Sequence, residues 1–144
     1  MKNAMFYAKQ VIKYCHENNH KITNLQLQKI LYFLQAQNIK FHNEPLFEDD
    51  FEAFQYGAII YEVYNNYSRY AAHAIADDIT DRLELSYKQK SLIENCMNLN
   101  PFKLVDINTQ VGGAWYKTFN NGVGIGEIIP KKHILLEVKE LINE

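Results

Sequence analysis

The segment 22–33 constrains the fold more than any other part of this chain, because it contains both a helix start and the beginning of an apolar helix face. Thr23 and Gln26 form a capping box, in which the threonine hydroxyl accepts from a backbone N–H of the first turn and the glutamine side chain reaches back. The apolar residues that follow recur at spacings of three and four, which predicts one helix face that only Asn38 interrupts. These residues are Leu27, Ile30, Leu31, Leu34 and Phe41. Pro45 and the polar residues before it predict the end of this helix.

Similar signals predict helices along the rest of the chain. They occupy residues 3–17, 60–72, 86–99, 102–109 and 130–142, and residues 114–119 are expected to add one or two turns. Ser86 and Gln89 repeat the capping box at the start of the fourth helix. Between the second and third helices, residues 46–57 are rich in aromatic side chains, which suit a pleated surface. We interpret them as a small hairpin whose turn is the acidic run 48–50.

The sequence therefore predicts a mainly α (α+β) fold, a compact bundle of about six helices with a small β-hairpin or ribbon after the second helix. Its 144 residues, 47% of them hydrophobic, fit a single domain spanning 1–144. The mean hydropathy of -0.34 and the lack of a long apolar run predict no transmembrane span. No apolar segment typical of a signal peptide follows the first residues, so we expect a cytoplasmic protein without a membrane partner.

The net charge of -2 gives little overall attraction for nucleic acid. The compact basic segment 131–133 keeps DNA as an alternative partner that is not favoured.

No motif in the chain predicts catalysis or a bound cofactor. His16 and His20 have the four-residue spacing of a zinc-binding pair, but the asparagines between them are expected to end the helix. The acidic residues 48–52 lack the spacing of an EF-hand, and the glycine-rich loop 122–126 lacks a phosphate-binding motif. The two cysteines, at positions 15 and 96, are expected to be buried and reduced. We therefore expect no enzyme, no cofactor and no metal site.

Four tyrosines follow one another at spacings of three in the third predicted helix. They are Tyr61, Tyr64, Tyr67 and Tyr70. On an α-helix each step of three falls roughly 60° short of a full turn, so the four rings spread over about half of the helix circumference. They cannot form one flat stacking platform. We expect some of them in the core and others exposed to a partner, because tyrosine is favoured at protein interfaces.

Three blocks of this sequence resemble the Panacea, or SocA-like, antitoxin family. Residues 22–36 are similar to the family's ITNLKLQKLLYFAQ helix. Residues 44–47 and 51–64 are similar to its EPLF and IEAWKYGPVVPEVY segments, and residues 109–115 to a weaker TH-x-E-x-PW block. The matching positions that we take as candidate partner-binding or family-motif residues are Asn24, Gln28, Lys29, Tyr32, Glu52, Tyr56, Gly57, Glu62, Tyr64 and Trp115.

The chain departs from the family pattern at several of these positions. The prolines of the second block are replaced by Ala58 and Tyr61. In the third block Gln110, Gly112 and Ala114 stand where the pattern has histidine, glutamate and proline, which puts any role of those residues in doubt.

The resemblance implies an antitoxin that neutralises a cognate toxin protein by direct binding, without a cofactor. Its alternatives are an adaptor for a ClpXP-type protease, a phage-encoded modulator of a host protein, and a DNA-binding autoregulator. For Gln28, Lys29, Glu52 and Tyr56, internal hydrogen bonding and partner contact are both open. Leu27, Leu31, Phe33 and Trp115 are expected in the core. Neither the toxin nor the oligomeric state follows from the sequence.

Overall fold

The structure is a computed structural model that describes the backbone of residues 1–142 and the side chains of residues 1–139. The described residues form seven α-helices, two 3-10 turns and a two-stranded antiparallel sheet, so the mainly α fold predicted from the sequence is confirmed. In chain order they are α1 (Ala4–Glu17), α2 (Asn24–His42), β1 (Glu52–Phe54), β2 (Gly57–Ile59), α3 (Tyr61–Tyr67), η1 (Ser68–Tyr70), α4 (Tyr87–Met97), α5 (Pro101–Asn108), α6 (Ala114–Phe119), η2 (Asn120–Gly122) and α7 (Lys131–Ile142). The seventh helix is α6, which was expected only as an additional turn or two.

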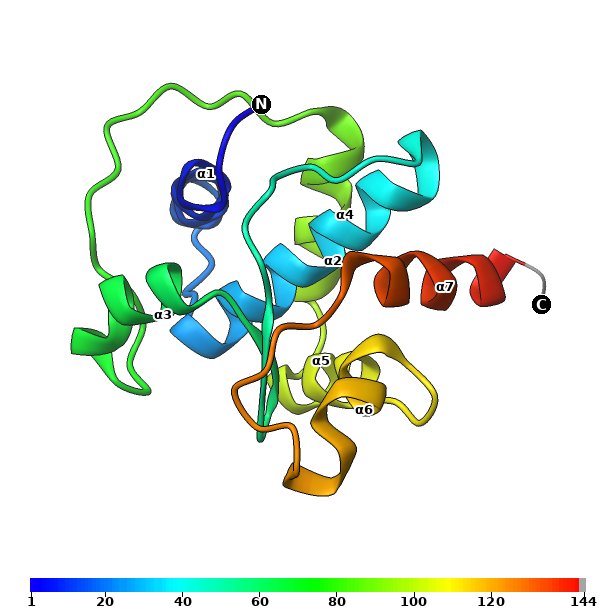
Figure 1. Cartoon of the computed structure of the whole chain (residues 1–144). Coiled ribbons are helices and arrows are strands. Elements are labelled where there is room, and N and C mark those ends of the chain that lie inside the picture. The colour runs from blue at the N-terminus through cyan, green and yellow to red at the C-terminus, as the bar shows by residue number, and fades with distance from the viewer. Residues whose placement is uncertain (143–144) are drawn as a thin grey trace.

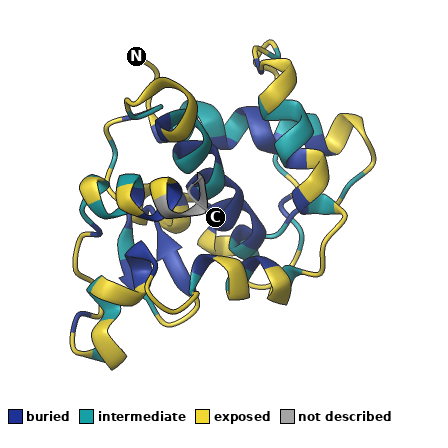
Figure 2. Cartoon of the chain, turned by 90° about the vertical axis from the view of Figure 1, so that its right-hand side faces the viewer, coloured by how far each residue is buried: buried dark blue, intermediate teal, exposed yellow. Residues whose placement is uncertain are grey.

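Helix α2 forms the centre of the molecule, and the other elements pack around it (Figure 1). It contacts α7, α1, α5, α4, α3 and strand β2. Figure 2 shows that the deepest burial follows α2 and the hairpin, while the outer faces of the surrounding helices are exposed. Leu27 and Leu31 are fully buried, as predicted, and Phe33 is partly buried against the core. The capping box of Thr23 and Gln26 is present, and Asn43 ends the helix in a left-handed conformation.

The hairpin follows α2, but its turn lies elsewhere than predicted. Gln55 and Tyr56 form the connection, because Phe54 pairs with Gly57 across the two strands. The acidic run 48–50 has no regular secondary structure and leads into β1, so its assignment as the turn was wrong. Tertiary contacts hold this run: Asp49 Oδ1 accepts from the backbone N–H of Ala4 (2.9 Å), and Asp50 pairs with Lys131 (2.8 Å).

The helix predicted for residues 60–72 is shorter in the structure. Helix α3 ends at Tyr67, and a 3-10 turn carries the chain to Tyr70. The side chains of Arg69 and Tyr70 both bond Asp77, and Ala71 has a φ of 51°, which turns the chain away from the helix axis. The split expected for the four tyrosines is confirmed, because Tyr67 is fully buried while Tyr61 and Tyr64 are exposed.

Further predictions concern the remaining helices and the cysteines. The second capping box, of Ser86 and Gln89, starts α4 as predicted. Cys15 and Cys96 are buried and unpaired, and burial raises the pKa of each thiol to about 12. Among the described helices, none has the length and apolar character needed to cross a membrane. The C-terminal apolar residues of α7, at positions 141 and 142, have side chains outside the described set.

Candidate functional site

A row of polar side chains on α2 is buried, although a core helix face is usually apolar. Asn24, Gln28, Lys29, Tyr32 and Gln35 project from successive turns of the helix, and each is almost or fully inaccessible to solvent. Buried polar groups destabilise a fold unless they are hydrogen-bonded. The partners of these side chains therefore show what the row does.

Two members of this row hold the outer edge of strand β2. Lys29 Nζ donates to the carbonyl oxygen of Ala58 (2.8 Å), and Gln28 Oε1 accepts from the backbone N–H of Ile60 (2.9 Å). Asn108 Oδ1, from α5, accepts from the N–H of Ala58 (2.9 Å). An unpaired strand edge otherwise offers its backbone groups to another chain. Side chains of two helices thus replace a neighbouring strand at this edge.

The same row extends to α3 and to the segment before the hairpin. Gln28 Nε2 donates to Asn24 Oδ1 (3.0 Å), and Asn24 Nδ2 donates to the carbonyl oxygen of Tyr64 (3.0 Å). Gln35 bonds both the carbonyl oxygen of Phe47 and the N–H of Leu46. The polar face of α2 consequently positions the whole segment from residue 46 to residue 64.

Gly57 is required where β2 meets the two helices. Its φ of +119° lies in a region that residues with a side chain rarely adopt. A Cβ atom there would lie 2.3 Å from Asn108 Oδ1 and 2.9 Å from Lys29 Nζ. The glycine therefore allows the close packing in which Lys29 reaches Ala58.

Lys29 is the most unusual charged group in the structure. Its side chain is 0% exposed, and none of the ion pairs formed by the described residues includes it. Burial lowers the pKa of the Lys29 ammonium from 10.5 to about 7. Beside it, the Asn108 amide nitrogen Nδ2 is buried and lacks a hydrogen-bond partner among the described residues.

A second polar connection joins α2 to the C-terminal helices. The Tyr32 hydroxyl donates to Glu137 Oε1 (2.8 Å), and Glu137 Oε2 accepts from the backbone N–H of Ala114 at the start of α6 (3.0 Å). Burial, with the nearby Glu137 carboxylate, raises the pKa of Tyr32 well above its usual value. The indole of Trp115 donates to the carbonyl oxygen of Phe54 at the hairpin (2.7 Å).

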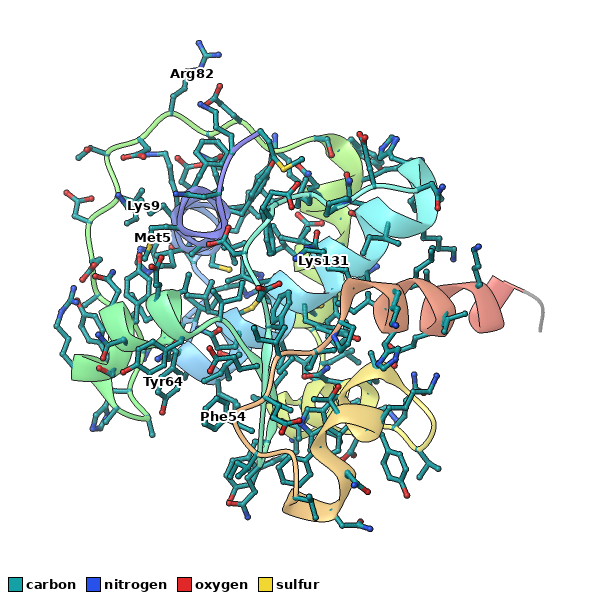
Figure 3. All side chains as sticks on the ribbon, in the orientation of Figure 1. Met5, Lys9, Phe54, Tyr64, Arg82 and Lys131 are labelled. Atoms are coloured by element: carbon teal, nitrogen blue, oxygen red, sulfur yellow. The ribbon has the colours of Figure 1, made fainter. Side chains whose placement is uncertain are left out.

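An open groove lies beside this framework, and we call it the tyrosine groove. It has a volume of about 640 Å³ and lies between the start of α2, the hairpin and α3. Its lining includes Leu25, Phe54, Tyr56, Tyr61, Tyr64 and Ile125. Figure 3 shows the labelled side chains of Phe54 and Tyr64 on the same side of the molecule. Tyr56, Tyr61 and Tyr64 are 62%, 56% and 43% exposed, so the rim is rich in accessible aromatic surface.

The structure divides the ten candidate residues into two groups. Those whose side chains make internal hydrogen bonds are Asn24, Gln28, Lys29, Tyr32 and Trp115, and Gly57 packs against Lys29 and Asn108. Those with accessible side chains are Tyr56, Glu62 and Tyr64, whereas Glu52 is half-buried in β1. A contact of any of them with a partner stays a prediction.

Sequence reasoning missed Asn108 and Glu137. Asn108 bonds Ala58, 50 residues away, and Glu137 bonds Tyr32 and Ala114, 105 and 23 residues away. The only signal available for each was a polar residue beside apolar helix positions.

In the basic segment 131–133, Lys131 pairs with Asp50 and also bonds the carbonyl oxygen of Glu48 (2.9 Å), which reduces the charge free for DNA. Figure 3 shows Lys131 at the start of α7.

Comparison with known families assigns the chain to a family. The family model of the antitoxin SocA-like, Panacea domain matches residues 27–116, which is more than half of the chain. The protein therefore belongs to the SocA-like Panacea family, whose name denotes an antitoxin-type role. No curated protein and no solved structure matches the chain. The matched region includes the polar row of α2 from Gln28 onward, the hairpin, α3 and Trp115.

Proposed function

We propose that this protein is an antitoxin that binds a cognate toxin directly and blocks it, using the tyrosine groove as its contact surface. The observation that carries the proposal is the set of three exposed tyrosines that line this groove in a member of an antitoxin family. Tyrosine is enriched among the residues that dominate binding energy, because it adds a large rigid area and a hydroxyl. The action is stoichiometric and needs no turnover.

The elements that form the groove are fixed by hydrogen bonds, which supports the same proposal. Its walls are the hairpin and α3, and side chains of α2 hold both through hydrogen bonds. A preorganised surface loses little conformational entropy on binding, which favours a tight complex. Exposed Ile125, in the loop after η2, extends the apolar surface beside the hairpin tip.

The test is co-expression of the chain with each adjacent open reading frame, scored by growth and then by co-purification. We expect one neighbour to be toxic alone, harmless with the wild-type chain and co-eluted with it. Tyr56→Arg and Tyr64→Arg should abolish both rescue and complex formation. Tyr116→Arg is the matched control, because Tyr116 is 41% exposed on α6 and lies outside the groove lining.

Two outcomes would contradict the proposal. Rescue that persists in both Tyr56 and Tyr64 variants would place the toxin contact elsewhere. Rescue without a complex would favour the alternative of a protease adaptor or host-directed modulator, which requires a second partner. Binding to operator DNA that weakens steeply with added salt would instead support an autoregulator.

A further inference from the structure

A second groove lies between α2, α4 and α5, and it shares no lining residue with the tyrosine groove. Its volume is about 420 Å³, and we call it the α2–α4 groove. The lining side chains that matter for the argument are Phe33, Phe41, Tyr87, Leu92, Leu99 and Ile107. Phe41 and Tyr87 are 52% and 86% exposed, so large aromatic surfaces remain accessible here.

The walls of this groove are two helical ridges. On α2, Phe33, Gln37 and Phe41 line it at spacings of four, and on α4 the lining residues run from Tyr87 to Cys96 at spacings of about three and four. Gln37 Nε2 joins the walls by donating to the carbonyl oxygen of Lys88 (3.3 Å). Ridges spaced in this way form the groove into which a further helix packs.

The charge at the groove is positive. Lys88 is the only charged side chain among the described residues that line it. The ammonium groups of Lys88 and Lys40 lie 4.1 Å and 5.6 Å from the centre of the Phe41 ring. Two cations therefore lie close to one exposed aromatic ring, in a chain whose net charge is -2. A carboxylate arriving beside this ring would meet both cations without an acidic neighbour in the lining.

We propose that the α2–α4 groove is a docking site for an amphipathic helix of a partner protein, with acidic residues beside the apolar face of that helix. The length of the groove wall agrees with this occupant. Helix α4 has 11 residues and is about 16 Å long, which matches about three turns of a docked helix. The apolar side chains of the partner fill the space between Phe33, Leu92 and Ile107. Its carboxylates lie over Phe41, next to Lys40 and Lys88. This site does not depend on toxin binding at the tyrosine groove.

The test uses the full chain with p-benzoylphenylalanine at position 87, expressed in cells that carry its own gene neighbourhood and irradiated. This photo-reactive analogue resembles the highly exposed tyrosine that it replaces, so it leaves the core unchanged. We expect a cross-link to a helix with apolar residues at spacings of three and four and with Asp or Glu beside them. Lys88→Glu should reduce the cross-link at least about tenfold, because it puts like charges together. Exchange of the partner's acidic residue for lysine should restore it.

Lys90→Glu is the control, since two helix positions, about 200°, separate Lys90 from the groove-lining Lys88. Thermal unfolding of each variant shows that the chain is folded. A cross-link to a second copy of the chain, to nucleic acid or to a non-helical segment would overturn the proposal. So would no cross-link from position 87, or one that Lys88→Glu leaves unchanged. The tyrosine groove is intact in these variants, so toxin rescue reports on it separately.

Discussion

Replacement of Lys29 by methionine tests whether a buried amine limits the stability of this fold. Lys29 is fully buried, its ammonium donates to Ala58, and burial lowers its pKa from 10.5 to about 7. Between these two values the unfolded chain binds a proton that the folded chain does not. The free energy of unfolding therefore rises with pH in this range and is lowest below about pH 7.

The magnitude follows from the pKa difference. A full shift from 10.5 to about 7 corresponds to a destabilisation on the order of 5 kcal/mol when Lys29 must be charged in the folded state. Between about pH 6 and about pH 8.5 the wild type should gain about 2 kcal/mol relative to the methionine variant. At the lower pH the variant should be at least as stable as the wild type, because removal of the buried charge outweighs the cost of about 1–3 kcal/mol for leaving the Ala58 carbonyl without its donor.

Urea unfolding at a series of pH values, followed by circular dichroism, measures this difference. Subtraction of the two profiles removes the other titrating groups, such as Cys15 and Cys96, whose raised thiol pKa lowers stability above about pH 9 in both proteins. Lys21→Met, at an exposed lysine, controls for the simple loss of a positive charge. A difference that stays constant within about 0.5 kcal/mol across the range would refute the lowered pKa of Lys29.

Three further substitutions test the framework, each by denaturant unfolding. Gly57→Ala should destabilise by at least about 2 kcal/mol, because it strains a positive φ and drives a Cβ to 2.3 Å from Asn108 Oδ1. Leu31→Ala should cost about 2–5 kcal/mol by leaving a cavity in the core, and a loss under about 1 kcal/mol would contradict its burial. Ala114→Pro should lower the free energy of unfolding by about 1–3 kcal/mol, because proline lacks the N–H that donates to Glu137. An unchanged denaturation midpoint would show that this hydrogen bond adds nothing to stability.

The elements that the sequence predicted well are those specified by neighbouring residues. The capping boxes at Thr23 and Ser86 each involve a partner three residues away, and both helices begin where these boxes indicate. The hairpin was predicted but its turn was misplaced. The run 48–50 has the composition of a turn, whereas its position is held by contacts with Ala4 and Lys131, which are distant in the chain.

The candidate site shows the same division between local and distant information. The sequence singled out Gln28 and Lys29 but left open whether they bond within the protein or contact a partner. Their buried bonds to Ile60 and Ala58 now account for their polarity. The third partner of this edge, Asn108, could not be predicted, because nothing near it in the chain indicates that its amide meets Ala58.

The hydrogen bonds of the α2 side chains lie inside the protein, which would let one fold serve different partners. The polar residues of the α2 motif are directed inward, where they fix the hairpin and α3. The exposed side chains on those elements, including Tyr56 and Tyr64, make no hydrogen bonds from their hydroxyls among the described residues, so their replacement leaves the framework intact. A recognition surface can then change while the buried motif holds its shape. Partner specificity should accordingly follow the tyrosine groove and not the motif by which the family is recognised.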